Sequence, residues 1–193
     1  MTLPTKLTLL RILLTFVTMA LLFLPGWGAK AAALACFLVA SLTDWLDGML
    51  ARRWHQISPL GALLDPIADK VLVLGCFLTF IQLRLIPAWM VLIIVLRELV
   101  ITGVRLLIAG RGTVLSAAQE GKHKTVSQFA TILVILSIVT LRAWAPGGLS
   151  PEVERAAGLL ILGCMWLTVL LTVISGAAFF WRHRAVLREV VTR

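Results

Sequence analysis

The chain has 193 residues, of which 60% are hydrophobic, and its formal net charge is +9 at pH 7. This apolar fraction exceeds that of soluble globular domains, so the composition excludes an ordinary soluble enzyme and predicts an integral membrane protein. The length allows one domain, and residues 1–193 are therefore predicted to form a single membrane domain.

Six apolar segments approach or reach the roughly 20 residues that a helix needs to cross a bilayer. In chain order they cover about 7–24, 29–53, 59–83, 87–108, 126–144 and 156–181. This pattern predicts an all-α integral membrane protein with six transmembrane helices. A cleaved signal peptide is the alternative for the first segment, because positive charge precedes it and small residues follow it. The segment is long for the apolar part of such a peptide, which favours a retained helix.

Most basic residues lie at the ends of the apolar segments, and their distribution predicts the orientation. Twelve Lys or Arg residues lie on the side of the two termini, and four lie on the opposite side. By the positive-inside rule, both termini are expected to be cytoplasmic. The basic residues form no continuous patch, so anionic lipid head groups or a phosphorylated substrate explain them better than nucleic acid does. No nucleic-acid partner is expected.

Four of the nine acidic residues gather in the second and third apolar segments: Asp44, Asp47, Asp65 and Asp69. Carboxylates at bilayer depth are costly and by default indicate a functional site. The two pairs have i, i+3 and i, i+4 spacing, so each pair shares one face if its segment is helical. Ser58-Pro59 is typical of a helix start, with a hydroxyl N-cap and proline at the first helical position.

Two carboxylate pairs facing each other would repel strongly unless cations lie between them. Hard divalent cations such as Mg²⁺ and Mn²⁺ prefer oxygen ligands, so the four aspartates predict a metal site. Gly48 and Gly61 leave room for a substrate near the backbone, and Arg52 is a donor suited to phosphate. The alternative is that arginines neutralise the carboxylates in purely structural contacts, but Arg52 and Arg53 cannot neutralise four acids.

These residues resemble a known family. The eight positions in Asp44-x-x-Asp47-Gly48-x-x-Ala51-Arg52 and Gly61-x-x-x-Asp65-x-x-x-Asp69 match the signature of the CDP-alcohol phosphatidyltransferases without departure. The resemblance implies a two-metal membrane enzyme that displaces CMP from a CDP-linked lipid with an alcohol. It implies that all four aspartates bind the metals and that Asp69 is also the base on the acceptor hydroxyl. The implied CDP-binding positions are Gly48, Ala51, Arg52, Ser58 and Gly61.

The amino-terminal stretch Leu3–Arg11 is similar to the corresponding stretch of the same family. That similarity implies that Thr5, Thr8 and Arg11 lie near the nucleotide. The alternative is an interfacial helix whose arginine extends to the membrane surface.

Positive charges in excess of what CDP requires cluster on the fourth segment and the loop that follows: Arg97, Arg105, Arg111, Lys122 and Lys124. An acceptor with its own phosphate would use them, whereas ordinary positive-inside topology is the alternative for each. Three motifs of the chain resemble those of the bacterial phosphatidylglycerophosphate synthases. They are Asp65-Pro66-x-Ala68-Asp69-Lys70 in the third segment, Arg97-Glu98 with Arg105 in the fourth, and Gly121-Lys122-x-Lys124-Thr125 in the loop that follows.

This second resemblance implies CDP-diacylglycerol as donor, sn-glycerol 3-phosphate as acceptor and a homodimer in the bacterial inner membrane, surrounded by membrane lipids. The charge distribution predicts that its active site faces the cytoplasm. Another acceptor remains open, such as inositol phosphate, serine or phosphatidylglycerol. A cation transporter is the alternative from another class, because intramembrane carboxylates also line ion paths. The absence of an inverted sequence repeat and the position of the acids near one membrane face oppose it.

Overall fold

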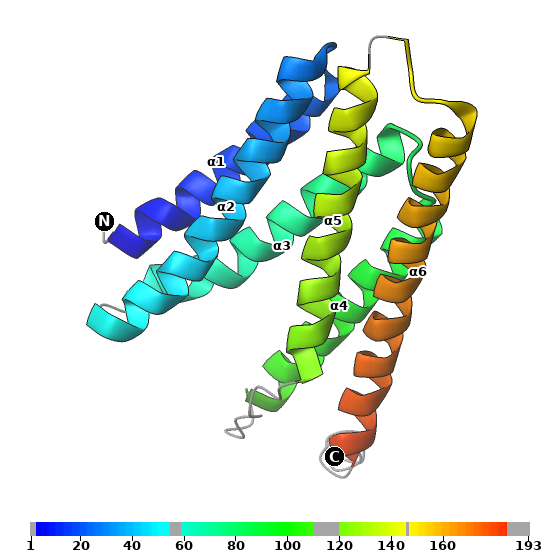
Figure 1. Cartoon of the computed structure of the whole chain (residues 1–193). Helices are drawn as coiled ribbons and strands as arrows, with labels where there is room; N and C mark the ends of the chain where they lie inside the picture. Colours follow the sequence, from blue (N-terminus) through cyan, green and yellow to red (C-terminus); the bar gives the residue numbers. More distant parts are fainter. Residues whose placement is uncertain (1–2, 55–58, 110–119, 146, 185–193) are drawn as a thin grey trace. The chain divides into compact units, whose positions relative to one another are not determined.

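The computed structural model describes the backbone of residues 3–54, 59–109, 120–145 and 147–184. It describes their side chains except those of residues 3–7, 44–54, 59–66, 69, 109 and 120–123. Within these ranges every regular element is a helix, which confirms the predicted all-α class (Figure 1). The six helices are α1 (Leu3–Phe23), α2 (Trp27–Trp54), α3 (Pro59–Gln82), α4 (Ala88–Ala109), α5 (Glu120–Trp144) and α6 (Pro151–Arg182).

Each helix covers one predicted apolar segment, and three helices begin four to six residues earlier than predicted: α1 at Leu3, α5 at Glu120 and α6 at Pro151. The predicted loop before the fifth segment extends to Lys124, whereas α5 already begins at Glu120. The prediction of a loop there is wrong, because glutamate and lysine are good helix formers and the run up to Val126 contains no proline. Lys122 and Lys124 therefore belong to a helix.

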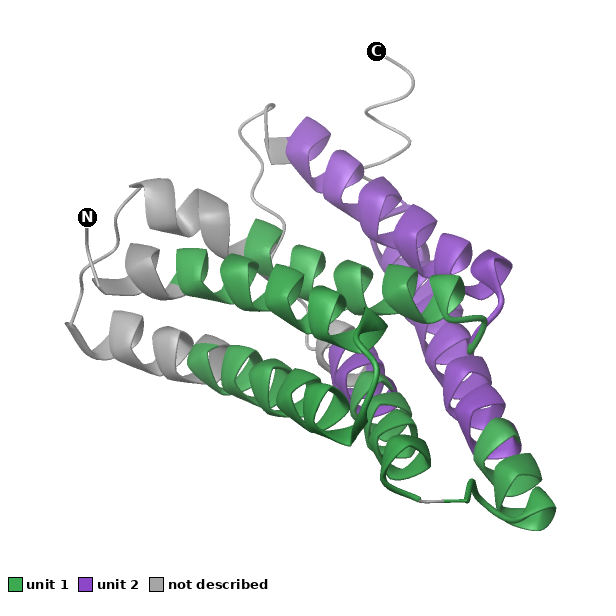
Figure 2. Cartoon of the chain, turned by 90° about the horizontal axis from the view of Figure 1, so that it is seen from above, with its two compact units in different colours: residues 1–85, 132–158 green, residues 86–131, 159–193 purple. Residues whose placement is uncertain are grey.

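The chain divides into two compact units (Figure 2). Unit 1 comprises residues 1–85 and 132–158, and thus α1 to α3 with the later part of α5 and the start of α6. Unit 2 comprises residues 86–131 and 159–193, and thus α4, the first part of α5 and most of α6. The single domain predicted over the whole chain remains a prediction.

In unit 1, α1 packs against both α2 and α3. The turn between α1 and α2 contains Gly26 with a φ of 94°, a conformation that glycine adopts without steric cost. The ammonium group of Lys30 donates hydrogen bonds to the carbonyl oxygens of Leu22 and Leu24. A cation at this position satisfies carbonyls that the end of α1 leaves without intrahelical partners. Lys30 thereby fixes the start of α2 against the end of α1.

The contact between α1 and α3 depends on a residue without a side chain. A Cβ atom added at Gly75 would lie 2.8 Å from Thr15 Cγ2 and 3.0 Å from Met19 Sδ. Small residues at such positions allow helices in a membrane to approach closely. Gly75 is therefore a point of close approach between α1 and α3.

The two faces of α1 have the reverse of the pattern seen in a soluble protein. Its buried face carries Thr8, Arg11, Thr15 and Thr18, all of them fully buried. Its exposed face carries large apolar residues, and Leu13 and Phe16 are 59% and 60% exposed. Polar groups that face the protein and apolar groups that face outward are the distribution expected where the surroundings are hydrocarbon.

Two described helical stretches, Lys124–Trp144 and Pro151–Arg182, are long and apolar enough to cross a membrane. Shorter apolar stretches occur at Thr8–Phe23, Trp27–Thr43 and Lys70–Gln82. The prediction of six spans with cytoplasmic termini stays a prediction.

We expect Gly75→Ala to destabilise the protein by about 1–3 kcal/mol, the usual cost of overpacking a tight contact. The β-branched Thr15 has little rotameric freedom with which to move away. Gly103→Ala on α4 is the matched control, because its added Cβ would meet no atom within 4 Å. Thermal unfolding in detergent measures both variants. Equal unfolding temperatures would contradict the close approach at Gly75.

Candidate functional site

The structure places the two halves of the aspartate motif on consecutive helices. Asp44 and Asp47 lie on α2, and Asp65 and Asp69 lie on α3. The backbone is helical through both pairs, so the spacing argument made from the sequence applies. The side chains of the four aspartates lie outside the described residues, and their convergence on metal ions stays a prediction.

The predicted CDP-binding residues distribute over the first three helices. Gly48, Ala51 and Arg52 lie on α2, and Gly61 lies on α3. Helix α3 begins at Pro59, as the sequence predicts, whereas Ser58 lies outside the described residues.

The amino-terminal part of the predicted site lies on α1, which carries Thr5 and Thr8. The side chain of Thr8 is fully buried, and so is that of Arg11. A buried guanidinium does not extend to the membrane surface, so the alternative interpretation of Arg11 as a snorkelling interfacial residue is wrong. A fully buried cation on α1 requires polar surroundings inside the protein.

In unit 2, two of the predicted acceptor-binding residues meet at one carboxylate. Arg97 Nη1 lies 3.2 Å from Glu98 Oε1, and the ammonium group of Lys124 pairs with the same oxygen atom. The side chains of Arg97 and Lys124 are only 14% and 9% exposed. The structure therefore brings Arg97 on α4 and Lys124 on α5 together around Glu98.

Helix α6 supplies a third side of this cluster. Arg97 Nη2 donates a hydrogen bond of 3.2 Å to Ser175 Oγ. The Nε atom of Arg97 is buried and has no hydrogen-bond partner among the described residues. We use the term phosphate cluster for Arg97, Glu98, Lys124 and Ser175.

The contact between α5 and α6 in unit 2 is polar as well. The hydroxyl groups of Thr131 and Thr168 lie 2.8 Å apart, and both residues are buried. Thr168 also donates to the carbonyl oxygen of Ser127 at 3.3 Å. Sequence reasoning missed this contact. The spacing of Thr168, Thr172 and Ser175 along an apolar helix was the signal that could have found it.

Of the three remaining predicted acceptor-binding residues, only Arg105 has a described side chain, and its printed contact is with an aromatic ring. The guanidinium of Arg105 lies over the ring of Phe179, 5.6 Å from its centroid. Arg105 and Arg97 are eight residues apart on α4, which is about 12 Å along a helix. Lys122 lies on α5 with an undescribed side chain, and Arg111 lies outside the described residues.

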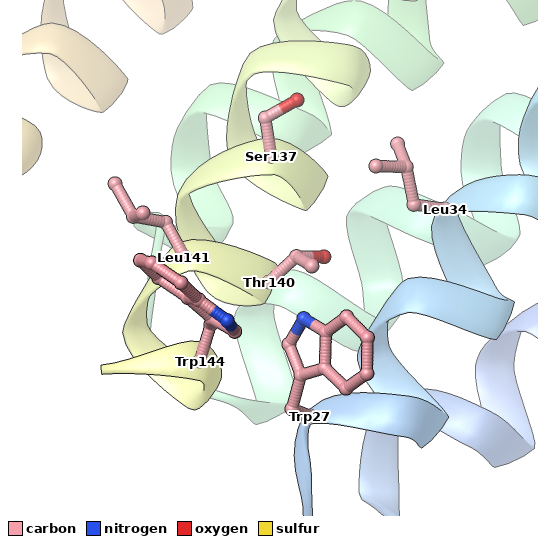
Figure 3. A pocket seen from close by; sticks show the side chains of 6 residues that line it. All are labelled: Trp27, Leu34, Ser137, Thr140, Leu141 and Trp144. Atoms are coloured by element: carbon pink, nitrogen blue, oxygen red, sulfur yellow. The ribbon is translucent and has the colours of Figure 1, made fainter. Parts of the chain in front are cut away.

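Unit 1 also contains an open pocket of about 380 Å³, which is lined by other residues (Figure 3). Trp27 and Leu34 of α2 line it together with four residues of α5: Ser137, Thr140, Leu141 and Trp144. None of these six residues belongs to the predicted site, and the lining is mainly apolar. The lining of this pocket contains no charged, histidine or cysteine side chain.

Comparison with known proteins identifies the family. The family-wide sequence profile described as CDP-alcohol phosphatidyltransferase matches residues 1–181. The chain belongs to the CDP-alcohol phosphatidyltransferase family. It is therefore an enzyme of the transferase class. The family and the two long apolar helices together indicate a membrane protein.

Curated relatives within this family carry a more specific name. A protein of Bacillus subtilis (strain 168) is 34% identical over 94% of this chain and 94% of its own length. A protein of Escherichia coli (strain K12) is 38% identical over 69% of this chain and 75% of its own length. Both are named CDP-diacylglycerol–glycerol-3-phosphate 3-phosphatidyltransferase.

We expect Glu98→Gln to destabilise the protein by about 1–3 kcal/mol, because it removes the charge that two poorly exposed cations share. The matched control is Glu154→Gln, which breaks the more exposed pair between Arg142 and Glu154. Exposed pairs contribute about 0–1 kcal/mol. Thermal unfolding in detergent compares the two variants. A loss at Glu98 no larger than that at Glu154 would contradict the pairing.

Proposed function

We propose that the chain transfers the phosphatidyl group of CDP-diacylglycerol to sn-glycerol 3-phosphate and releases CMP. The products are phosphatidylglycerophosphate and CMP. The observation that carries this proposal is the match to the Bacillus subtilis relative, which extends over 94% of both chains. A match of this extent includes the aspartate motif and also α4 to α6, where the phosphate cluster lies.

The residues of the aspartate motif fit two divalent metal ions, Mg²⁺ or Mn²⁺. The donor set consists only of carboxylates, and oxygen is the ligand type that these ions prefer. Asp44, Asp47, Asp65 and Asp69 would hold the ions, from two helices that are consecutive in the chain. When bound, such ions stabilise the negative charge on a pyrophosphate during in-line displacement.

The proposed step is an attack of the acceptor on the phosphatidyl phosphorus. The hydroxyl oxygen of glycerol 3-phosphate forms the new bond to phosphorus, and the bond between this phosphorus and the oxygen bridging it to CMP breaks. CMP leaves with the electron pair of that bond. Asp69 accepts the hydroxyl proton, since a carboxylate within hydrogen-bond reach can act as a general base.

Separate groups of residues would bind the two substrates. Residues of α1 to α3, together with Ser58, would hold the CDP moiety: Thr5, Thr8, Gly48, Ala51, Arg52 and Gly61. Arg97 and Lys124 would bind the acceptor's phosphate, with Arg105, Arg111 and Lys122 adding positive charge. Charge-assisted hydrogen bonds to phosphate are stronger than neutral ones, so a cationic cluster favours an acceptor that carries phosphate.

We also propose the membrane topology, the location and the oligomeric state of the enzyme. The six apolar segments support six membrane spans, and the distribution of basic residues supports cytoplasmic termini and an active site facing the cytoplasm. The bacterial inner membrane is implied by the family resemblance. A homodimer among membrane lipids follows from the family resemblance. The cytoplasmic location would give water-soluble glycerol 3-phosphate direct access, while the lipid donor enters from the bilayer.

The first test is CMP release by purified protein in detergent with CDP-diacylglycerol, Mg²⁺ or Mn²⁺ and a panel of acceptors. We expect release with glycerol 3-phosphate and little with serine, inositol phosphate or phosphatidylglycerol. Removal of the metal with a chelator should abolish release, and Asp69→Asn should reduce it by at least about a hundredfold.

Each other outcome of this test selects an alternative. Release with only another acceptor would keep the family and overturn the acceptor. Metal-independent release would contradict the proposed role of the four aspartates. No release from folded protein with any acceptor would contradict the proposed transfer and would favour the cation transporter.

Lys124→Met should raise the KM for glycerol 3-phosphate by about ten- to a hundredfold, because a charge-assisted hydrogen bond contributes about 1.5–3 kcal/mol. The KM for CDP-diacylglycerol should change much less. Steady-state kinetics with each substrate varied in turn measures both constants. Equal increases in the two KM values would count against a role in acceptor binding.

A further inference from the structure

We infer that Ser175 and Gly176 of α6 position the Arg97 side chain for the phosphate of the acceptor, and so help to determine which acceptor is used. The inference rests on the proposed function. It assigns a role to α6, a helix that carries none of the residues predicted from the sequence to bind substrate or metal.

The hydroxyl group of Ser175 fixes one end of the Arg97 guanidinium. Ser175 Oγ donates to the carbonyl oxygen of Thr172 at 3.0 Å and accepts from Arg97 Nη2 at 3.2 Å. A hydroxyl has one donor and can accept as well. Because its donor is engaged by the backbone of α6, its lone pairs remain directed at the arginine.

Gly176 provides the space in which the Arg97 side chain lies. A Cβ atom added at Gly176 would lie 3.3 Å from Arg97 Cγ and 3.9 Å from Arg97 Nε. The first distance is shorter than an ordinary van der Waals contact, so the arginine would have to move. Gly158 and Gly163, on the same helix, would meet no atom within 4 Å on the same change.

The remaining contacts of Arg97 leave donor capacity for a ligand. Its Nη1 contacts Glu98, its Nη2 contacts Ser175, and its Nε has no hydrogen-bond partner among the described residues. A guanidinium has five N–H donors in a fixed planar arrangement. The Arg97 guanidinium is held at both terminal nitrogens, so its other N–H donors have one fixed orientation. Bidentate recognition of phosphate requires such a fixed orientation.

The position of Lys124 supports the same conclusion. Lys124 on α5 pairs with Glu98, the residue that also contacts Arg97. Both cations therefore lie beside the same carboxylate. A phosphate bound beside them would accept charge-assisted hydrogen bonds. Ser175 and Gly176 contact one of these two cations, Arg97.

The test measures KM and kcat for Gly176→Ala and Ser175→Ala in detergent, with glycerol 3-phosphate and CDP-diacylglycerol varied in turn. We expect the KM for glycerol 3-phosphate to rise by about three- to tenfold, which corresponds to the loss of one hydrogen bond or a displaced donor. The KM for CDP-diacylglycerol and kcat should stay within about twofold of the wild-type values.

Two matched controls on α6 separate positioning from general helix packing. Gly163→Ala adds the same methyl group where no atom is near. Thr168→Val removes a buried hydroxyl that bonds to α5 and not to Arg97. Neither control should change the KM for glycerol 3-phosphate by more than about twofold.

The possible failures are distinguishable. Wild-type protein that releases no CMP in response to glycerol 3-phosphate refutes the proposed function and this inference with it. Active wild-type protein whose Ser175→Ala and Gly176→Ala variants behave like the two controls overturns the inference alone. If Gly176→Ala does not fold, Ser175→Ala decides the result by itself, because it adds no atoms.

Discussion

Polar and charged groups on apolar helices must find partners inside the protein, because hydrocarbon offers them none. This constraint explains the reversed faces of α1, where Thr8, Arg11 and Thr15 are buried while Leu13 and Phe16 are exposed. It also explains the hydroxyl contacts between α5 and α6 at Thr131 and Thr168. In both units, polar groups therefore lie where helices contact one another.

The phosphate cluster follows from the same constraint. Arg97 and Lys124 come from different helices, and each would be costly in an apolar environment without a counter-charge. Glu98 supplies one negative charge for both. This arrangement stabilises both cations inside the protein. Under the proposed function, stability and acceptor recognition would depend on the same carboxylate.

The sequence predicts the helices well because apolar length and breakers such as Pro59 are local signals. The start of α5 was misplaced by the polar character of Gly121–Thr125, since polarity is a weak guide where helix propensity and the following apolar run extend the helix. The eight-position aspartate motif places the predicted metal site on α2 and α3, because its spacing is fixed within each helix.

What the sequence could not predict are the contacts between distant helices. Arg97 and Ser175 are 78 residues apart, and nothing local indicates that they meet. Nothing local indicates the contact of Gly176 either. The absence of a side chain at Gly176 leaves space for the side chain of Arg97 on α4. Among the five predicted acceptor-binding residues, sequence proximity grouped Arg105 with Arg97, whereas the structure pairs Arg105 with the ring of Phe179.

The most direct test of this account is to identify the lipid product. Protein in vesicles containing CDP-diacylglycerol would receive Mg²⁺ and glycerol 3-phosphate labelled in its carbon atoms, and the extracted lipids would be analysed by mass spectrometry. The account predicts a labelled lipid with two phosphates, formed in equal amount to CMP. CMP formed together with unlabelled phosphatidic acid would mean that water is the acceptor, and this result would contradict the account.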